Sequence, residues 1–142
     1  MLNVHVNDLF PERRIEKDAA IETLDNIRDD IAFRLNEGAT RRKSAMHTPV
    51  VVTDDADARV MVLRQFDRVG WRLRFHTDAR SPKVDVIGDG APVGVLFYDR
   101  EAKVQVRCRG RGWIERDTPL VDEAWAKSTN FARRCYLGEG PG

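Results

Sequence analysis

Between residues 49 and 115, short stretches rich in apolar residues alternate with short polar turns, and this spacing limits the fold more than any other feature. Runs of this kind are typical of β-strands, and they cover residues 49–53, 59–66, 71–77, 93–99 and 104–115. The links at 54–57, 67–70 and 100–103 have hairpin length, so the strands that they join should run antiparallel. The spacing therefore predicts a small closed or nearly closed antiparallel barrel.

An amphipathic helix is predicted before the strands, over residues 18–35. Apolar residues recur there at steps of three and four, with charged residues between them. These apolar positions are Ile21, Leu24, Ile27, Ile31 and Leu35. Asn36 and Gly38 follow the last of them and predict the end of the helix.

Two further helices are predicted within and after the strands. Ser81 followed by Pro82 has the pattern of an N-cap and a first helical turn. Residues 117–119 carry a similar signal, for a helix that continues after a break into 131–137. The 142 residues are therefore expected to form a single domain that is mainly β with flanking helices.

Charge and composition exclude several classes of protein. The 24 Lys and Arg residues nearly balance the 23 Asp and Glu residues, so no overall basic field favours nucleic acid. No stretch approaches the roughly 20 apolar residues of a membrane span. Cys108 and Cys135 lack the spacing of a metal site or a disulfide framework and are expected to be reduced thiols. A cytoplasmic protein without a metal is expected.

Four residues could together hold a phosphate group. Arg59 and Arg64 mark the ends of one predicted strand, and Ser81 and Lys83 stand at the start of the next helix. Guanidinium groups and helix N-termini both bind anions well. Strict alternation puts the two arginines on opposite faces of the strand, so joint action requires a bulge or a terminal position. The alternative is that both arginines are simply solvated.

A second polar set lies on one face of the last predicted strand, opposite Val104, Val106 and Cys108. Its members are Gln105, Arg107, Arg109 and Arg111. A row of arginines can contact a nucleic-acid backbone, although an ordinary solvent face can look the same, and Gln105 could instead contact the polar edge of a heterocycle. No catalytic acid or base can be singled out from this pattern.

Three ordered segments of the chain resemble the FMN-binding core of the pyridoxamine 5'-phosphate oxidase-like family, in its uncharacterised FMN-binding branch. They are residues 59–64, 75–83 and 104–110, and the resemblance extends from about His47 to the last residue. It implies the fold known as the FMN-binding split barrel. It also implies that FMN sits at the interface of a homodimer.

The resemblance assigns roles to individual residues. Arg59 and Arg64 would bind the FMN phosphate, together with the pair Ser81 and Lys83. The other positions that the resemblance places at the flavin ring are Val62 and Leu63 through their backbone, the pair His76 and Thr77, and Gln105. His76 stands where the family usually has Tyr, Arg64 where it has Lys, and Pro82 where the oxidase has Arg.

The function implied by the resemblance is that of an FMN-dependent oxidoreductase, acting on a small molecule or a nicotinamide donor. The oxidase continues into a C-terminal segment that contributes to its flavin and pyridoxal phosphate sites and that has no counterpart here, so a different substrate is expected. Two alternatives remain open. One is a flavin-binding protein without turnover, and the other is a split barrel that binds haem, a deazaflavin or another ligand.

Overall fold

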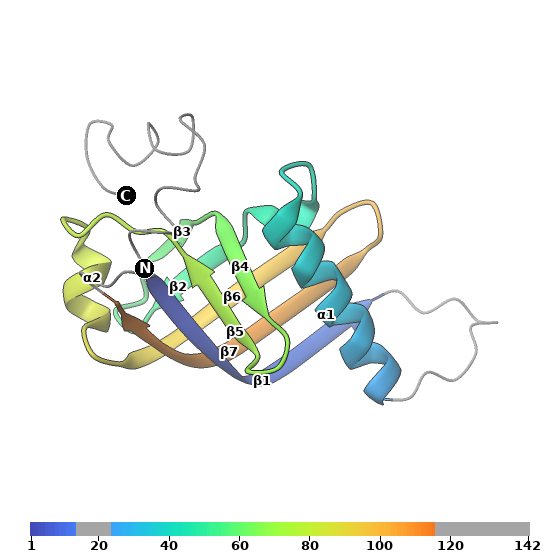
Figure 1. Cartoon of the computed structure of the whole chain (residues 1–142), viewed down its shortest axis with the longest axis horizontal. Helices are drawn as coiled ribbons and strands as arrows, with labels where there is room; N and C mark the ends of the chain where they lie inside the picture. Colours follow the sequence, from blue (N-terminus) through green and yellow to red (C-terminus); the bar gives the residue numbers. More distant parts are fainter. Residues whose placement is uncertain (14–23, 116–142) are drawn as a thin grey trace.

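The chain passes from one edge of its sheet to the other through only two residues. A computed structural model describes residues 1–13 and 24–115 as a sheet of order β3-β2-β6-β7-β1-β5-β4. The edge strands β3 (Ala58–Val60) and β4 (Leu63–Asp67) are joined by Met61 and Val62. Such a link spans at most about 11 Å between Cα atoms. The two edges must therefore face each other, and the curled sheet forms a barrel that is split between β3 and β4 (Figure 1).

Every neighbouring pair of strands in this sheet is antiparallel. The remaining strands are β1 (Leu2–Arg13), β2 (Val50–Thr53), β5 (Arg72–Phe75), β6 (Ala91–Asp99) and β7 (Val104–Ile114). The helices are α1 (Leu24–Thr40), a 3-10 turn η1 (Ala45–His47) and α2 (Pro82–Ile87). α1 and α2 lie at opposite ends of the sheet (Figure 1). This arrangement confirms the predicted antiparallel split barrel.

Strand β1, which was not predicted from the sequence, lies between β7 and β5 in the sheet. Apolar and polar residues alternate in the first half of its sequence, and Leu2, Val4 and Val6 are buried. The register then shifts between Val6 and Asp8, so the alternation is interrupted by a bulge. The predicted strand at 59–66 was also wrong in one respect, because the chain leaves the ladder at Met61 and forms two strands. The other four predicted strands are confirmed.

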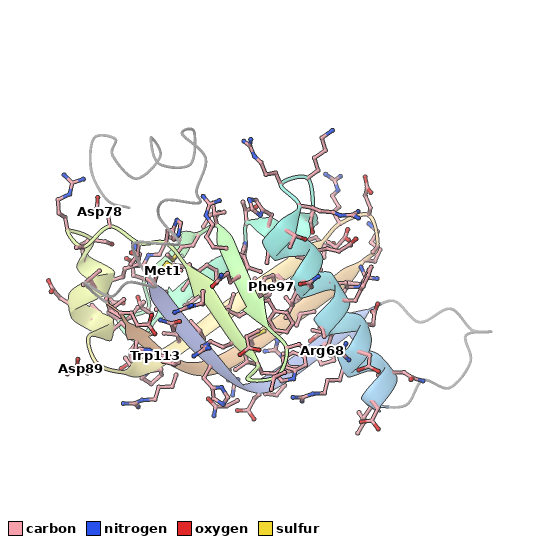
Figure 2. The ribbon with its side chains drawn as sticks, viewed as in Figure 1. Met1, Arg68, Asp78, Asp89, Phe97 and Trp113 are labelled. Atoms are coloured by element: carbon pink, nitrogen blue, oxygen red, sulfur yellow. The ribbon has the colours of Figure 1, made fainter. Side chains whose placement is uncertain are left out.

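The barrel interior is filled by side chains from the strands and from one face of α1. The largest fully buried members are Phe75, Phe97, Leu2, Leu35, Met46, Leu63, Leu73, Ile87, Val4, Val51, Val84 and Val106. Figure 2 shows Phe97 in the middle of the molecule, behind β4 and β5. Close packing of this set holds the strand ends in fixed positions.

The structure corrects the predicted N-terminal helix. Helix α1 continues to Thr40, past Asn36 and Gly38, where the sequence predicted its end. Gly38 does not end the helix but lets it approach η1, because a Cβ there would lie 2.7 Å from the Cβ of Met46. Leu24 is 84% exposed and takes no part in the apolar face. The beginning of the prediction, at residues 18–23, lies outside the described residues.

The short helix predicted at Ser81 is confirmed, with Ser81 as its N-cap and Pro82 at its first position. The helix predicted over 117–137 lies outside the described residues. Within the described ranges, no helix combines the length and the apolar character needed to cross a membrane.

Candidate functional site

Most of the candidate residues lie along the split of the barrel. Arg59 is the middle residue of one edge strand and Arg64 the second residue of the other, on either side of the link that contains Val62. The ladder is broken at this link, and the register of β4 against β5 shifts again between Leu63 and Gln65. The strand irregularity that joint action of Arg59 and Arg64 requires is therefore present.

Arg59 is held by the turn between β2 and β3. Its side chain is only 11% exposed, and it forms an ion pair with Asp57. Its Nη1 also donates a 3.1 Å hydrogen bond to Oγ1 of Thr53. The Nε atom is buried and has no hydrogen-bond acceptor among residues 1–13 and 24–115. The guanidinium is thus fixed at one end and keeps one buried donor available.

Lys83 lies close to Arg59 and is likewise buried. Its Nζ donates a 2.6 Å hydrogen bond to Oγ of Ser81, which is 1% exposed. Burial and the nearby positive charge of Arg59 lower the pKa of Lys83, and Asp78 and Asp57 oppose this shift. Two cations buried near each other repel, so an anion between or beside them would be stabilising.

His76 and Thr77 follow directly after β5. Burial, together with the charges of Arg64 and the N-terminus, lowers the pKa of His76 to about 4, so the imidazole is neutral at pH 7. Nε of Arg64 and Oγ1 of Thr77 are both buried, and neither has a hydrogen-bond partner within the described part of the chain. The buried Nε of Arg64 and Oγ1 of Thr77 are therefore available to bind a ligand.

Arg72, Arg74 and His76 alternate with apolar residues, yet Arg74 and His76 are each only 5% exposed. Nε of Arg74 donates to Oδ1 of Asn3 at 2.6 Å, and Nη2 to Oε2 of Glu115 at 2.6 Å. These bonds fasten the end of β5 to β1 and to the residue after β7. His76 therefore projects from a rigid strand end. Figure 2 shows Met1 and Asp78 toward the α2 end of the molecule.

Gln105 does not join the other candidates within one chain. It lies near the start of β7, opposite Glu12 of β1. The end of β5 is instead next to Leu2, which pairs with Ile114 at the far end of β7. Nine residues of strand separate Gln105 from Ile114, which corresponds to about 30 Å.

Thr53 and Asp57, which hold Arg59, were not predicted as site residues from the sequence. A signal was available, because the predicted turn at 54–57 places Thr53 and Asp57 at the two ends of one hairpin. The backbone N–H of Thr53 in fact donates to the carbonyl of Asp57 at 3.0 Å. Among the described residues, no three His, Cys, Asp or Glu side chains gather as they would around a metal ion.

The comparison with protein families supports the reading of this split. The family model for the pyridoxamine 5'-phosphate oxidase FMN-binding domain matches residues 32–116. The chain belongs to this family. In this FMN-binding family member, all candidate residues from Arg59 to Gln105 fall inside the matched segment, whereas β1 precedes it. No curated protein matches the chain.

The residues at the split of this family member fit FMN. Arg59 and Lys83 lie near each other and near the carboxylates of Asp55, Asp57 and Asp78. The Nε atoms of Arg59 and Arg64 are buried and have no hydrogen-bond acceptor within residues 1–13 and 24–115. Buried donors without acceptors are costly, and phosphate oxygens are strong acceptors that match guanidinium groups. The structure therefore has the donors that a phosphorylated flavin requires.

Proposed function

We propose that this chain binds FMN in the split between β3 and β4 and acts as an FMN-dependent oxidoreductase. The observation that carries the proposal is the pair of neighbouring cations, buried Lys83 and half-buried Arg59, on one side of the break in the ladder, with half-buried Arg64 on the other side. Arg59, Lys83 and Ser81 would bind the phosphate. The main chain of Val62 and Leu63 is not paired across the split and would contact the flavin ring.

The remaining candidates would set the surroundings of the ring. His76 is buried and neutral, so it would accept or donate a hydrogen bond without adding charge. Arg64 lies close to His76 and would stabilise negative charge that develops on a reduced ring. Bound FMN itself supplies the capacity to accept a hydride. The substrate would be a small molecule or a nicotinamide donor.

A homodimer is part of the proposal. Gln105 is the ring-contact position that the family resemblance implies. It lies about 30 Å of strand away from Ile114, the end of β7 that only β1 separates from the end of β5 before His76. A second copy of the chain would bring its own Gln105 to the split of the first. Each flavin would then contact residues from both copies.

The proposal is tested by an absorption spectrum of the full-length protein, after incubation with FMN and removal of free ligand. Flavin bands that remain with the protein would support binding, and anaerobic bleaching by NADH, NADPH or pyridoxamine phosphate would support turnover. Retained bands that no donor bleaches would favour a flavin-binding protein without turnover. A preparation that retains haem and no flavin would overturn the proposal.

A further inference from the structure

The hydroxyl group of Thr53 lies where three polar groups of the turn between β2 and β3 converge. Thr53 is the last residue of β2 and is only 3% exposed. Its Oγ1 atom lies 2.5 Å from Oδ1 of Asp55, 3.1 Å from Nη1 of Arg59 and 3.4 Å from the carbonyl oxygen of Asp57. One buried hydroxyl thus connects an exposed carboxylate to the guanidinium beside the split.

These contacts determine which way the hydroxyl proton points. A threonine hydroxyl has one proton to donate and two lone pairs that can accept. The Asp55 carboxylate and the carbonyl of Asp57 can only accept, whereas Nη1 of Arg59 can only donate. The contact with Asp55 is the shortest and has the length of a strong charge-assisted hydrogen bond, so the proton lies toward Asp55. A lone pair of Thr53 is therefore left facing Arg59.

Asp55 is suited to hold this proton. The hydrogen bond from Thr53 lowers the pKa of Asp55, and the charge of Arg59 acts in the same direction, so the carboxylate is ionised at neutral pH. Its Oδ1 also accepts from the backbone N–H of Asp57 at 3.4 Å, which keeps it over the turn. Within the described turn no hydrogen bond joins Asp55 to Arg59 directly, so Asp55 acts on Arg59 through Thr53.

Two anchors determine the direction of the Arg59 guanidinium. Asp57 forms an ion pair with one terminal nitrogen, Nη2, and Thr53 accepts from the other, Nη1. Because the guanidinium is planar and rigid, holding both terminal nitrogens also fixes where Nε points. This Nε is buried and has no acceptor among the described residues. Without Thr53 only the ion pair would remain, and repulsion from the neighbouring Lys83 would turn the group away from the split.

We propose that Thr53 and Asp55 determine the specificity of the split for a phosphorylated flavin. Asp55 directs the hydroxyl of Thr53, Thr53 directs Arg59, and Arg59 then distinguishes FMN from riboflavin, which has no phosphate. The inference rests on the proposed function, because it concerns how the same site selects its ligand. Neither residue needs to touch the flavin, so both are positioning residues.

The test measures the affinities of FMN and riboflavin for full-length variants, by quenching of flavin fluorescence. Thr53→Val keeps the shape of the side chain but loses the hydroxyl, so it should weaken FMN about 10-fold and riboflavin less than about 2-fold. Thr53→Ser retains a hydroxyl and should bind FMN within about 2-fold of wild type. Circular dichroism and thermal melts check that each variant folds.

Asp55→Ala and Asp54→Ala form a matched pair. Both remove one negative charge from the same turn, and by charge alone both should strengthen the binding of an anion. Asp54 is exposed, and within the described turn it forms no hydrogen bond to Thr53 or Arg59. Asp55→Ala should instead bind FMN about 5-fold more weakly than Asp54→Ala does, because the hydroxyl of Thr53 is then free to turn. The opposite sign separates positioning from charge.

The orientation of Arg59 gives a readout that needs no flavin. Nitrogen NMR resolves Nη1 and Nη2 of an arginine as separate signals when rotation of the guanidinium is hindered. The two signals of Arg59 should be separate in wild type and Thr53→Ser and should merge in Thr53→Val. Inorganic phosphate should shift the Nε signal of Arg59 in wild type at concentrations about 10-fold lower than in Thr53→Val.

These readouts distinguish failure of the inference from failure of the proposed function. Equal losses of FMN and riboflavin in Thr53→Val, or an Asp55→Ala protein that binds FMN as tightly as Asp54→Ala, would overturn the inference alone. A wild type that binds neither flavin overturns the proposed function alone, if phosphate still shifts the Arg59 signal and Thr53→Val weakens this response. If phosphate has no effect, or the same effect on both proteins, the inference fails as well.

Discussion

Nζ of Lys83 donates a 2.6 Å hydrogen bond to Oγ of Ser81, the residue that begins α2. The bond holds the ammonium beside the guanidinium of Arg59 although both groups are largely removed from water. α2 has only six residues, so its own dipole is small and the side chains must supply most of the attraction for an anion.

Removing these two charges should weaken FMN far more than riboflavin, which has no phosphate. In the double variant Arg59→Gln and Lys83→Met, each lost charge-assisted hydrogen bond should cost about 1.5–3 kcal/mol, or roughly 10- to 150-fold in affinity. Quenching of flavin fluorescence during titration measures both ligands. Arg68→Gln, whose side chain is 61% exposed in the hairpin between β4 and β5, serves as the control and should leave both affinities unchanged. An equal loss for the two flavins would contradict the assignment of the phosphate.

His76 should make the protein less stable in mild acid. Its pKa is about 4 in the folded chain and 6.5 in the unfolded chain. Between these values the unfolded state binds more protons, so the free energy of unfolding should fall as the pH decreases from 6.5 towards 4, by up to about 3 kcal/mol. Urea denaturation at several pH values measures this slope. His76→Asn should flatten it, and a variant as steep as wild type would rule out His76 as the cause.

Arg74 should be far more important for stability than its neighbour Arg72. Arg74→Met leaves the Asn3 and Glu115 acceptors without their donor and should cost about 3–5 kcal/mol. Arg72 forms a longer ion pair, 3.6 Å from Asp67, and both partners are about 40% exposed. Arg72→Met should therefore cost less than about 1 kcal/mol. The two midpoints of urea denaturation provide the comparison, and similar losses would show that the Arg74 network is not stabilising.

Two glycines in neighbouring strands should respond very differently to alanine. A Cβ at Gly110 would lie 1.9 Å from the carbonyl oxygen of His5, next to the bulge of β1, and only a movement of the backbone could relieve it. Gly110→Ala should therefore destabilise the barrel by more than about 3 kcal/mol. At Gly94 an added Cβ would meet no atom closer than 3.8 Å, so Gly94→Ala should stay within about 1 kcal/mol. Thermal melts of dilute samples test this contrast, and a Gly110→Ala protein that melts like wild type would contradict it.

Local patterns were enough to predict the hairpins and α2. Each depends on residues a few positions apart, such as Ser81 with Pro82, whose preferences act within one turn. β1 depends instead on pairing with β7, about 100 residues away in the sequence, and the bulge after Val6 disguises its alternation. Pro11 also argues against a strand when only local preferences are considered. The predicted helix end at Gly38 was wrong, because the sequence alone does not show that Met46 packs against this glycine.

The candidate site shows the same division. The order Arg59, Arg64, Ser81 and Lys83 could be related to a phosphate from the sequence alone. The burial of His76 could not be predicted from the sequence, because it depends on the hydrogen bonds that Arg74 makes to residues distant in the sequence. Likewise, the alternation of β7 predicted that Gln105 lies on the polar face of that strand. Only the pairing of β7 with β1 shows at which end of the barrel Gln105 lies.

The two-residue link between β3 and β4 has a consequence for how this family can vary. A loop normally accepts insertions, because extra residues extend into solvent at little cost. Here an added residue after Val60 would instead move the edges of the barrel apart or shift β4 by one position, which turns every side chain of that strand to the opposite face. The length of this link should therefore be more strictly inherited than the identity of Met61 or Val62.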